Sequence, residues 1–336
     1  MNSIAGKRIA LYGGAGFVGH HLAIGLKTMG ADVHVVDSLQ VNSLGAIASE
    51  VDPPYDRERY LSIVHERLNL LRAADIPVYV QDLRDYHALT RIFNQIEPQV
   101  IIHLAAVAHA GQSNRDPFNT YDHSLRTLEN ALDNGRQRVE QFIYFSSSMV
   151  YGDFQSDSIT EDHPQNPIGI YGALKLAGEK IVIGYHQVFG LPYTIIRPSA
   201  LYGPRCVSRR VGQIFIESAL DGRPIRVNGD GSDRLDFTYI DDLIHGVARV
   251  IEKPEARNQT FNLTFGEGRS IQSLIDCIRE SIDIPRVEYV ERDRLMPVRG
   301  TLCVDKAREL LNYSPQHSIE RGVPLYIEWY RQFLAR

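Results

Sequence analysis

The chain of 336 residues is longer than one minimal domain and suits a large α/β domain with a smaller companion. A formal net charge of −5, without a block of about five like charges, excludes the electrostatic footprint of a nucleic-acid or anionic-membrane binder. Three scattered cysteines and no apolar stretch of about 18 residues argue against a disulfide framework and a membrane span, so we expect a cytoplasmic protein with a small-molecule partner.

Short apolar runs alternate with helical patterns along the first half of the chain. The runs predict strands at residues 8–12, 33–36, 78–80, 100–103, 142–145 and 193–196. This rhythm is typical of a doubly wound, Rossmann-type parallel sheet with crossover helices, so we predict the α/β class. Residues 56–72 predict an added helix with a charged side, which we interpret as a local elaboration.

The first strand runs into a glycine-rich turn. Gly13, Gly16 and Gly19 leave room for a pyrophosphate at the N-terminus of the helix that follows. Asp37 ends the second strand, about twenty residues on, where an acidic side chain hydrogen-bonds the adenosine ribose. No Arg or Lys occurs in residues 38–40, so NAD is favoured over NADP. A plain turn would explain either feature alone, but their spacing favours a dinucleotide site.

Tyr171 and Lys175 lie four residues apart, and hence on one face of a helix predicted to reach Tyr185. A nearby ammonium favours the phenolate, so we expect Lys175 to lower the pKa of Tyr171 from about 10. Such a pair also arises by chance on protein surfaces. The residues upstream of Tyr171 are therefore needed to distinguish a catalytic pair from a chance surface pair.

Upstream, a serine cluster at 146–148 ends a predicted strand and precedes Val-Tyr-Gly at 150–152. With this pattern the chain resembles the nucleotide-sugar epimerase and dehydratase branch of the extended short-chain dehydrogenases. That branch ends the strand with Ser or Thr three residues before Val-Tyr-Gly. Further landmarks spread the resemblance over nearly the whole chain: His103-Leu104-Ala105-Ala106, Asp116-Pro117, Arg197-Pro198, Tyr202-Gly203-Pro204-Arg205 and Asp236-Phe237-Thr238-Tyr239-Ile240-Asp241-Asp242.

The resemblance implies a catalytic trio. Tyr171 would take the proton from the sugar 4-hydroxyl, Ser147 would hydrogen-bond the same oxygen, and Lys175 would hold the nicotinamide ribose. The residues expected to bind NAD are Gly13, Gly16, Phe17, Val18, Gly19, Asp37, Asp82, Leu83, Leu104, Ala105, Ala106, Tyr171, Lys175 and Pro198. Asp82 could instead cap a helix.

After Arg197-Pro198 the sequence changes to loops rich in Gly, Pro and Arg. The resemblance implies that residues 1–197, with a returning segment near 236–264, form mainly an NAD-binding Rossmann domain. Residues 198–336 would form mainly a smaller, mixed α/β domain that binds the nucleotide sugar. No repeat or flexible linker separates the two parts, so we expect the ligand site between them.

The two residues after the expected catalytic hydroxyl narrow the range of reactions that we expect. In this branch 4,6-dehydratases carry Asp and Glu there and glucuronate decarboxylases carry a Glu second, whereas this chain has Ser148 and Met149. Methionine cannot transfer a proton. We therefore favour an NAD-dependent 4-epimerase that acts through a transient 4-keto intermediate on a UDP-hexose or UDP-hexuronate. Alternatives are a 4-dehydrogenase, less readily a 4,6-dehydratase or decarboxylase, and a non-catalytic NAD-binding sensor or scaffold.

The sequence also offers candidates for contact with the substrate. Leu235 stands where the family often has the arginine of the substrate diphosphate, so Arg299 first, and then Arg209 and Arg210, are candidates. Each of the three could equally be a solvated surface charge. The remaining candidates for substrate contact are Ser113, Ser148, Met149 and Ala200. Because Ala200 and Ser124 replace frequent asparagines, the sugar stays open.

Two further expectations concern metals and assembly. None of the twelve histidines forms an HxxxH pair with a matching acid, so no metal site is predicted, and for His109 a structural role is favoured. Helices near 117–134 and 171–189 carry apolar residues on more than one face. The resemblance implies that they form the four-helix contact of a homodimer, although ordinary core burial gives the same pattern.

Overall fold

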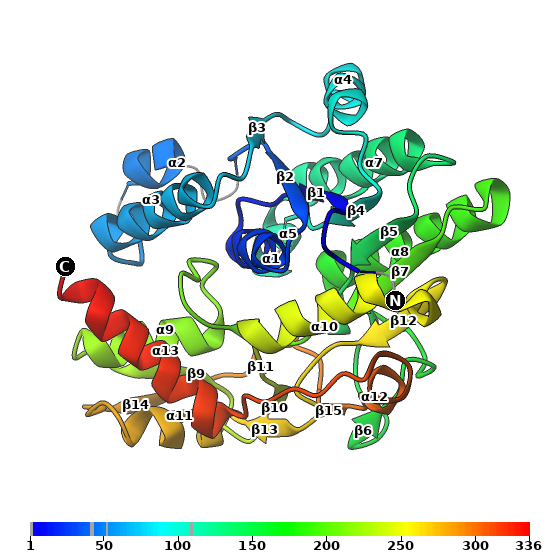
Figure 1. Ribbon diagram of the computed structural model, residues 1–336. Coiled ribbons are helices and arrows are strands. Elements are labelled where there is room, and N and C mark those ends of the chain that lie inside the picture. The colour runs from blue at the N-terminus through cyan, green and yellow to red at the C-terminus, as the bar shows by residue number, and fades with distance from the viewer. Residues whose placement is uncertain (1–2, 41–43, 52, 108–109) are drawn as a thin grey trace.

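A computed structural model describes residues 3–40, 44–51, 53–107 and 110–336. Seven parallel strands form one sheet in the order β12-β7-β5-β4-β1-β2-β3 (Figure 1). They are β1 (Arg8–Tyr12), β2 (Asp32–Asp37), β3 (Val78–Val80), β4 (Val100–His103), β5 (Gln141–Phe145), β7 (Tyr193–Arg197) and β12 (Gln259–Asn262). The predicted Rossmann-type α/β fold is confirmed, and the seventh strand returns from the second half of the chain.

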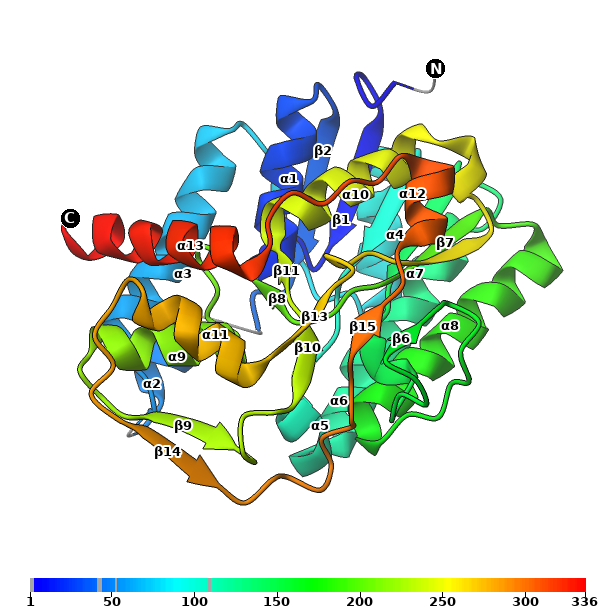
Figure 2. The same cartoon turned by 90° about the horizontal axis from the view of Figure 1, so that it is seen from below.

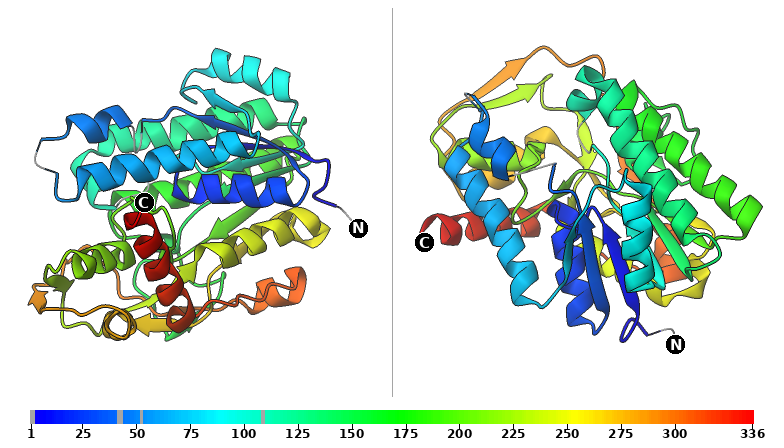
Figure 3. Two further views of the ribbon diagram at one scale, coloured as in Figure 1. Left: turned by 60° about the vertical axis from the view of Figure 1, so that its left-hand side comes forward. Right: turned by 90° about the horizontal axis from the view of Figure 1, so that it is seen from above.

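Helices cover both faces of the sheet (Figure 3). On one face, α3 (Arg57–Ala73) and α10 (Ile240–Glu252) flank α1 (Phe17–Thr28), and the other face carries α4 (Tyr86–Ile96), α7 (Thr127–Gly135) and α8 (Gly169–Phe189). Alternate strand residues supply the two cores: Leu11 packs towards α1, and Tyr12 packs towards α7. Burial on both faces explains why the strands are continuous apolar runs. No helix in the described ranges is long and apolar enough to span a membrane.

The helix predicted near 117–134 is continuous but not regular. It consists of α6 (Pro117–Tyr121), a π-helical turn (Asp122–Arg126) and α7. Such π turns often occur at functional sites because they displace a side chain from the regular helical position.

The second half of the chain forms a layer of short elements below the sheet (Figures 1 and 2). They are β8 (Leu201–Tyr202), α9 (Val211–Leu220), β9 (Ile225–Asn228), β10 (Arg234–Asp236), β11 (Thr238–Tyr239), β13 (Gly268–Ser270), α11 (Ile271–Arg279), β14 (Val287–Val290), β15 (Thr301–Leu302), α12 (Asp305–Leu311) and α13 (Ile319–Leu334). Shorter pieces elsewhere are α2 (Leu44–Ser49), α5 (Ala110–Arg115), β6 (Ser158–Ile159) and 3₁₀ turns at Ser148–Val150 and Pro254–Ala256. One apolar cluster runs from the sheet into this layer, so the two parts pack closely.

The added helix α3 contacts the second half of the chain. Its Arg67 is fully buried, and Nε donates to the carbonyl oxygen of Arg205 at 2.9 Å. Tyr60 of α3 packs in a small cluster with Val207 and the partly buried Trp329. The helix predicted near 56–72 is confirmed, and its contacts extend beyond its neighbours in sequence, because α3 also holds the loop that follows β8.

Candidate functional site

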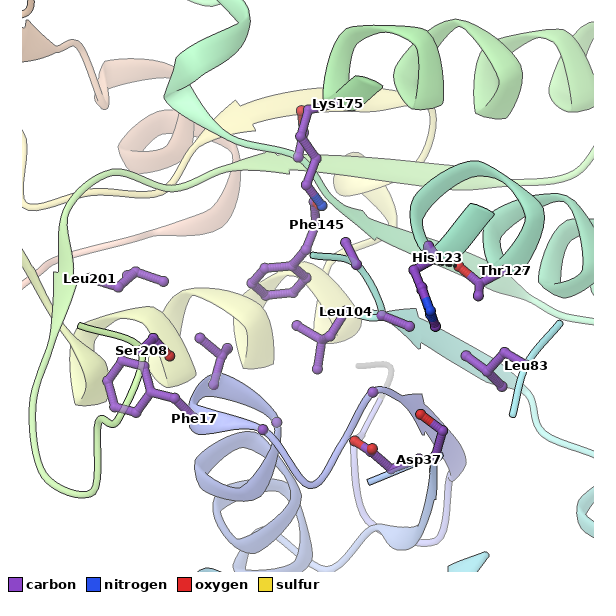
Figure 4. A pocket seen from close by; sticks show the side chains of 18 of the residues that line it. Phe17, Asp37, Leu83, Leu104, His123, Thr127, Phe145, Lys175, Leu201 and Ser208 are labelled. Atoms are coloured by element: carbon purple, nitrogen blue, oxygen red, sulfur yellow. Dashed lines mark hydrogen bonds between the residues drawn. The ribbon is translucent and has the colours of Figure 1, made fainter. Parts of the chain in front are cut away.

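A cavity opens where the strands β1, β2, β4, β5 and β7 end, against the N-terminus of α1 (Figure 4). All the residues predicted to bind NAD line it. In Figure 4, Lys175 and Asp37 lie at opposite ends, with His123 and Leu83 on one side and Phe17 on the other. The further lining residues are Ser38, His123, Thr127, Phe145, Ser146, Leu201, Ser208 and Arg210.

The glycine-rich turn forms a cradle that fits a dinucleotide. Gly13 has a φ of +82°, and a Cβ there would lie 2.7 Å from the backbone nitrogen of Ala105. At Gly16, the carbonyl oxygen of Gly13, at 3.6 Å, is the one atom of the described residues beyond its chain neighbours that lies within 4 Å of a Cβ. Protein packing therefore does not require glycine at residue 16. A ligand phosphate that approached the helix N-terminus closely would require it.

Asp37 joins the turn to the end of β2. Its carboxylate accepts hydrogen bonds from Ala15 N at 2.9 Å and from Leu39 N at 2.8 Å. Burial raises the pKa of Asp37, while these two bonds and the Arg67 charge act to lower it. Asp37 thus serves the strand-end turn and also faces the cavity, so the two interpretations of this residue are compatible.

Asp82 was open to two interpretations, as an adenine contact or as a helix cap. The N-cap of α4 is Asp85, which accepts from Ala88 N. Asp82 lines the cavity instead and pairs with Arg84, whose Nη2 lies 2.7 Å from its Oδ2. The helix-cap alternative is therefore excluded for Asp82.

Tyr171 and Lys175 line the other end of the cavity, and Ser147, which is buried and outside the lining, lies behind them at the end of β5. Ser147 lies close enough to Tyr171 to lower its pKa, and the Ser147 oxygen accepts from Met149 N at 3.2 Å. Lys175 Nζ donates to the carbonyl oxygen of Phe145 at 2.7 Å and lies 6.0 Å from the ring centre of Tyr171. Strand end and helix therefore bring together a hydroxyl, a phenol and an ammonium.

The expected pKa of Tyr171 needs correction. Burial raises it above the usual value of 10, and the effects that lower it come from Arg210 and from the Ser147 hydrogen bond, not from Lys175. Burial also lowers the pKa of Lys175 to about 8, against an opposing effect of Glu179. The spacing placed the two groups correctly, but desolvation outweighs their mutual attraction.

The neighbouring arginines Arg209 and Arg210 point to different places. Arg209 has a left-handed φ of 51°, and its Nη1 donates to the carbonyl oxygen of Pro54 at 2.8 Å, beside the Tyr55 ring. Arg210 is the N-cap residue of α9 and lines the cavity, and its buried Nε has no hydrogen-bond partner among the described residues. Arg210 is therefore the arginine of this pair that is available to a ligand.

Other substrate candidates lie outside the cavity lining. Ser113 and Ser148 are buried, Met149 and Ala200 are partly buried, and Leu235 packs in the core. Arg299 lies near Asp233 and Arg292, and burial lowers its pKa to about 10. These residues are not gathered around the cavity, so their predicted contacts stay predictions.

Sequence reasoning missed several lining residues. His123 and Thr127 enter the cavity from the π turn and the start of α7, and helical irregularity leaves no sequence motif. Ser208 comes from a loop with no local signal either. His109 lies outside the described residues, and within those residues no group of three or more His, Cys, Asp or Glu side chains is placed to hold a metal ion.

Comparison with known proteins agrees with this geometry. The family described as "NAD dependent epimerase/dehydratase family" matches residues 9–264. The chain belongs to the NAD-dependent epimerase/dehydratase family. The uncharacterized UDP-glucose epimerase YtcB of Bacillus subtilis is 32% identical over 228 residues, which cover 67% of this chain and 72% of that protein.

Two solved structures of epimerases share the whole fold. The UDP-glucose 4-epimerase of Thermotoga maritima, solved with UDP-glucose, is 29% identical with a TM-score of 0.82, and the match covers 97% of this chain and 99% of that one. The UDP-glucuronic acid 4-epimerase of Bacillus cereus, solved with UDP-glucuronic acid and NAD, is 25% identical with a TM-score of 0.83 and the same coverage. As an enzyme of this family, the protein uses NAD, and the glycine cradle and Asp37 are the features that fit it.

Proposed function

We propose that this enzyme is a UDP-sugar 4-epimerase that acts through a transient 4-keto sugar. The observation that carries the proposal is the cavity itself, with a dinucleotide cradle and Asp37 at one end and Tyr171 and Lys175 at the other. The names of the relatives favour a UDP-hexose or a UDP-hexuronate as substrate.

The proposed chemistry assigns one task to each side chain. Tyr171 takes the proton of the sugar 4-hydroxyl and later returns it, while Ser147 hydrogen-bonds the same oxygen. Lys175, anchored on the Phe145 carbonyl oxygen, orients the nicotinamide ribose. Bound NAD supplies the acceptor and then the donor of the C4 hydride. Because burial raises the pKa of Tyr171, the Arg210 charge and the Ser147 hydrogen bond are needed to help it act as a base.

The arrangement favours epimerisation over elimination or decarboxylation. Ser148 is 1% exposed, and neither it nor Met149 lines the cavity. The carboxylates among the described lining residues are Asp37 and Asp82, and Asp37 lies at the far end from Lys175. An acid-base pair for loss of water is therefore not offered beside Tyr171.

The test is a panel of UDP-, GDP-, CDP- and dTDP-sugars incubated with the purified protein without added NAD, followed by proton NMR and mass spectrometry. We expect an isomer of unchanged mass from a UDP-sugar. Tyr171→Phe should lower turnover by about 10²- to 10⁴-fold, the usual contribution of a general base. Tyr86→Phe, which alters an exposed tyrosine on α4, is the matched control and should keep full activity.

Other products would refute the epimerase. A ketosugar that accumulates only with added NAD would indicate a 4-dehydrogenase, and loss of water or carbon dioxide would indicate a dehydratase or decarboxylase. A protein that binds NAD but converts no sugar would support the sensor or scaffold.

We further propose Arg210 as the residue that pairs with the substrate diphosphate, since it is the cavity-lining arginine with a free Nε. For assembly, we propose a homodimer through α6, α7 and α8. Phe118 and Val188 on these helices are 81% and 72% exposed, which is unusual for large apolar side chains unless another surface covers them.

A further inference from the structure

Helix α8 contacts the end of β5 at three successive turns. Tyr171 lies near Ser147, which acts to lower its pKa, Lys175 Nζ donates to the Phe145 carbonyl oxygen at 2.7 Å, and the Ser146 hydroxyl donates to Glu179 Oε1 at 2.5 Å. The three helix residues follow at intervals of four, which places them on one face. Glu179 thus continues a row whose first two members form the proposed catalytic pair.

Glu179 is itself held in a buried ion pair. Arg197 Nε donates to Glu179 Oε1 at 2.9 Å and Nη2 donates to Oε2 at 2.7 Å, with side-chain exposures of 3% for Arg197 and 1% for Glu179. Arg197 Nη1 also donates to the Tyr151 hydroxyl and to the Glu161 carbonyl oxygen, both at 2.9 Å. Two-point pairing of this kind fixes the carboxylate in position.

Among the titratable groups around Lys175, Glu179 supplies the favourable negative charge. Tyr144 of β5 lies under Nζ at 5.2 Å, and His103 of β4 is also near. Burial raises the pKa of Tyr144 well above 10 and lowers the pKa of His103 to about 3, so both stay neutral near pH 7, as does Tyr171 with its raised pKa. Glu179 is the group that raises the pKa of Lys175 against desolvation.

We propose that Glu179 is a positioning residue of this active site: its carboxylate, held by Arg197 one helical turn beyond Lys175, is the counter-charge of that ammonium and, through Ser146, fixes the strand end that carries Ser147. The proposal rests on the roles proposed above for Ser147 and Lys175. A purely structural Glu179 would serve only as the partner of Arg197, and its loss would leave the titration of Lys175 unchanged.

The direct readout is the titration of Lys175 by NMR in the full-length protein labelled with ¹³C at the lysine ε-carbon. The chain has only six lysines, so the spectrum is simple: Lys7, Lys27, Lys175, Lys180, Lys253 and Lys306. Lys175→Met identifies the signal, and the wild-type midpoint is expected near 8.

Two substitutions should move this midpoint in opposite directions. Glu179→Gln removes the favourable charge and should lower the Lys175 midpoint by about one pH unit. Arg197→Gln removes the opposing cation, leaves the Glu179 carboxylate to Lys175 and should raise the midpoint. Tyr151→Phe is the matched control, because it removes a hydrogen bond from the same buried network without changing its charge, and should leave the midpoint in place.

Opposite shifts in two folded variants cannot come from general damage to the fold. If circular dichroism shows that one variant is unfolded, the folded one is compared with Tyr151→Phe, and a Lys175 shift in the stated direction that Tyr151→Phe lacks supports the proposal. An unchanged Lys175 midpoint in a folded variant, or shifts in the same direction, would overturn the proposal. With an active substrate, the alkaline limb of the rate profile should move as the midpoint does. If the wild type converts no nucleotide sugar, the proposed function fails, while the NMR titration still decides the role of Glu179.

Discussion

The sheet side and the loop side of the cavity place their residues by different means. On the sheet side, Gly13, Asp37 and Leu104 follow directly from strand ends, and parallel strands bring such ends together at one edge. On the loop side, Ser208 and Arg210 come from the loop after β8, which contacts with α3 and α13 hold in place. Motifs predict residues well only where a regular element carries them.

The largest expected effect is on the sheet side. Gly13→Ala introduces a Cβ 2.7 Å from Ala105 N at a φ of +82°, so both strain and a backbone clash oppose the native turn. We expect NAD affinity to fall by at least about 100-fold, measured by calorimetry. Gly184→Ala is the control, because no atom lies within 4 Å of a Cβ there. Unchanged NAD binding in Gly13→Ala would show that the turn tolerates a side chain.

On the loop side, the pair Arg209 and Arg210 separates a structural from a ligand-facing arginine. Arg210→Met should lower kcat/KM for a UDP-sugar by about 10- to 100-fold, because a charge-assisted hydrogen bond contributes about 1.5–3 kcal/mol. Arg209→Met loses a bond to Pro54 and should affect stability more than kcat/KM. A larger loss of kcat/KM in Arg209→Met than in Arg210→Met would reverse this assignment.

A histidine between the two sides of the cavity should make the free energy of unfolding depend on pH. His21 of α1 bonds the carbonyl oxygen of Pro204 at 2.9 Å, and burial, with the charges of Arg205 and Arg67, lowers its pKa to about 4. Between pH 6.5 and 4 the unfolded chain binds a proton at His21 that the folded chain does not. The free energy of unfolding should therefore fall as the pH is lowered from 6.5 to 4, by up to about 1.4 kcal/mol per pH unit from this group.

His21→Gln keeps a donor for Pro204 and removes the titration, so its unfolding free energy should depend less on pH. Urea unfolding across the window compares the two proteins. Other buried groups, such as Asp236 with its pKa raised to about 6, act in the opposite direction in both proteins and cancel in the difference. Parallel curves for wild type and variant would exclude His21 as a source of the pH dependence.

The smallest effect on activity is expected from a substitution on α6, away from the cavity. Phe118→Asp on α6 should convert the proposed dimer to a monomer in light scattering with little change in kcat, since an exposed site away from the cavity contributes little to folding stability. Leu334→Asp on α13, where the side chain is 48% exposed, is the control and should stay dimeric. A monomeric wild type would remove the dimer proposal.

The amino-acid sequence alone determined the parallel sheet, the glycine cradle, Asp37 and the row of Tyr171 and Lys175. Periodicity, turn chemistry and spacing are local properties, so they are visible without the fold. The predicted NAD residues lie together for the same reason, since nearly all of them follow strand ends or lie on a helix start.

Only the tertiary structure decided the rest. It placed Arg210 in the cavity and Arg209 outside it, joined α3 to the loop at Arg205, and put Glu179 beside Lys175 in a buried pair with Arg197. It also reversed the expected pKa shift of Tyr171. Burial and long-range pairing set these properties, and neither is encoded in the spacing of neighbouring residues, because desolvation depends on what the rest of the chain packs around a group.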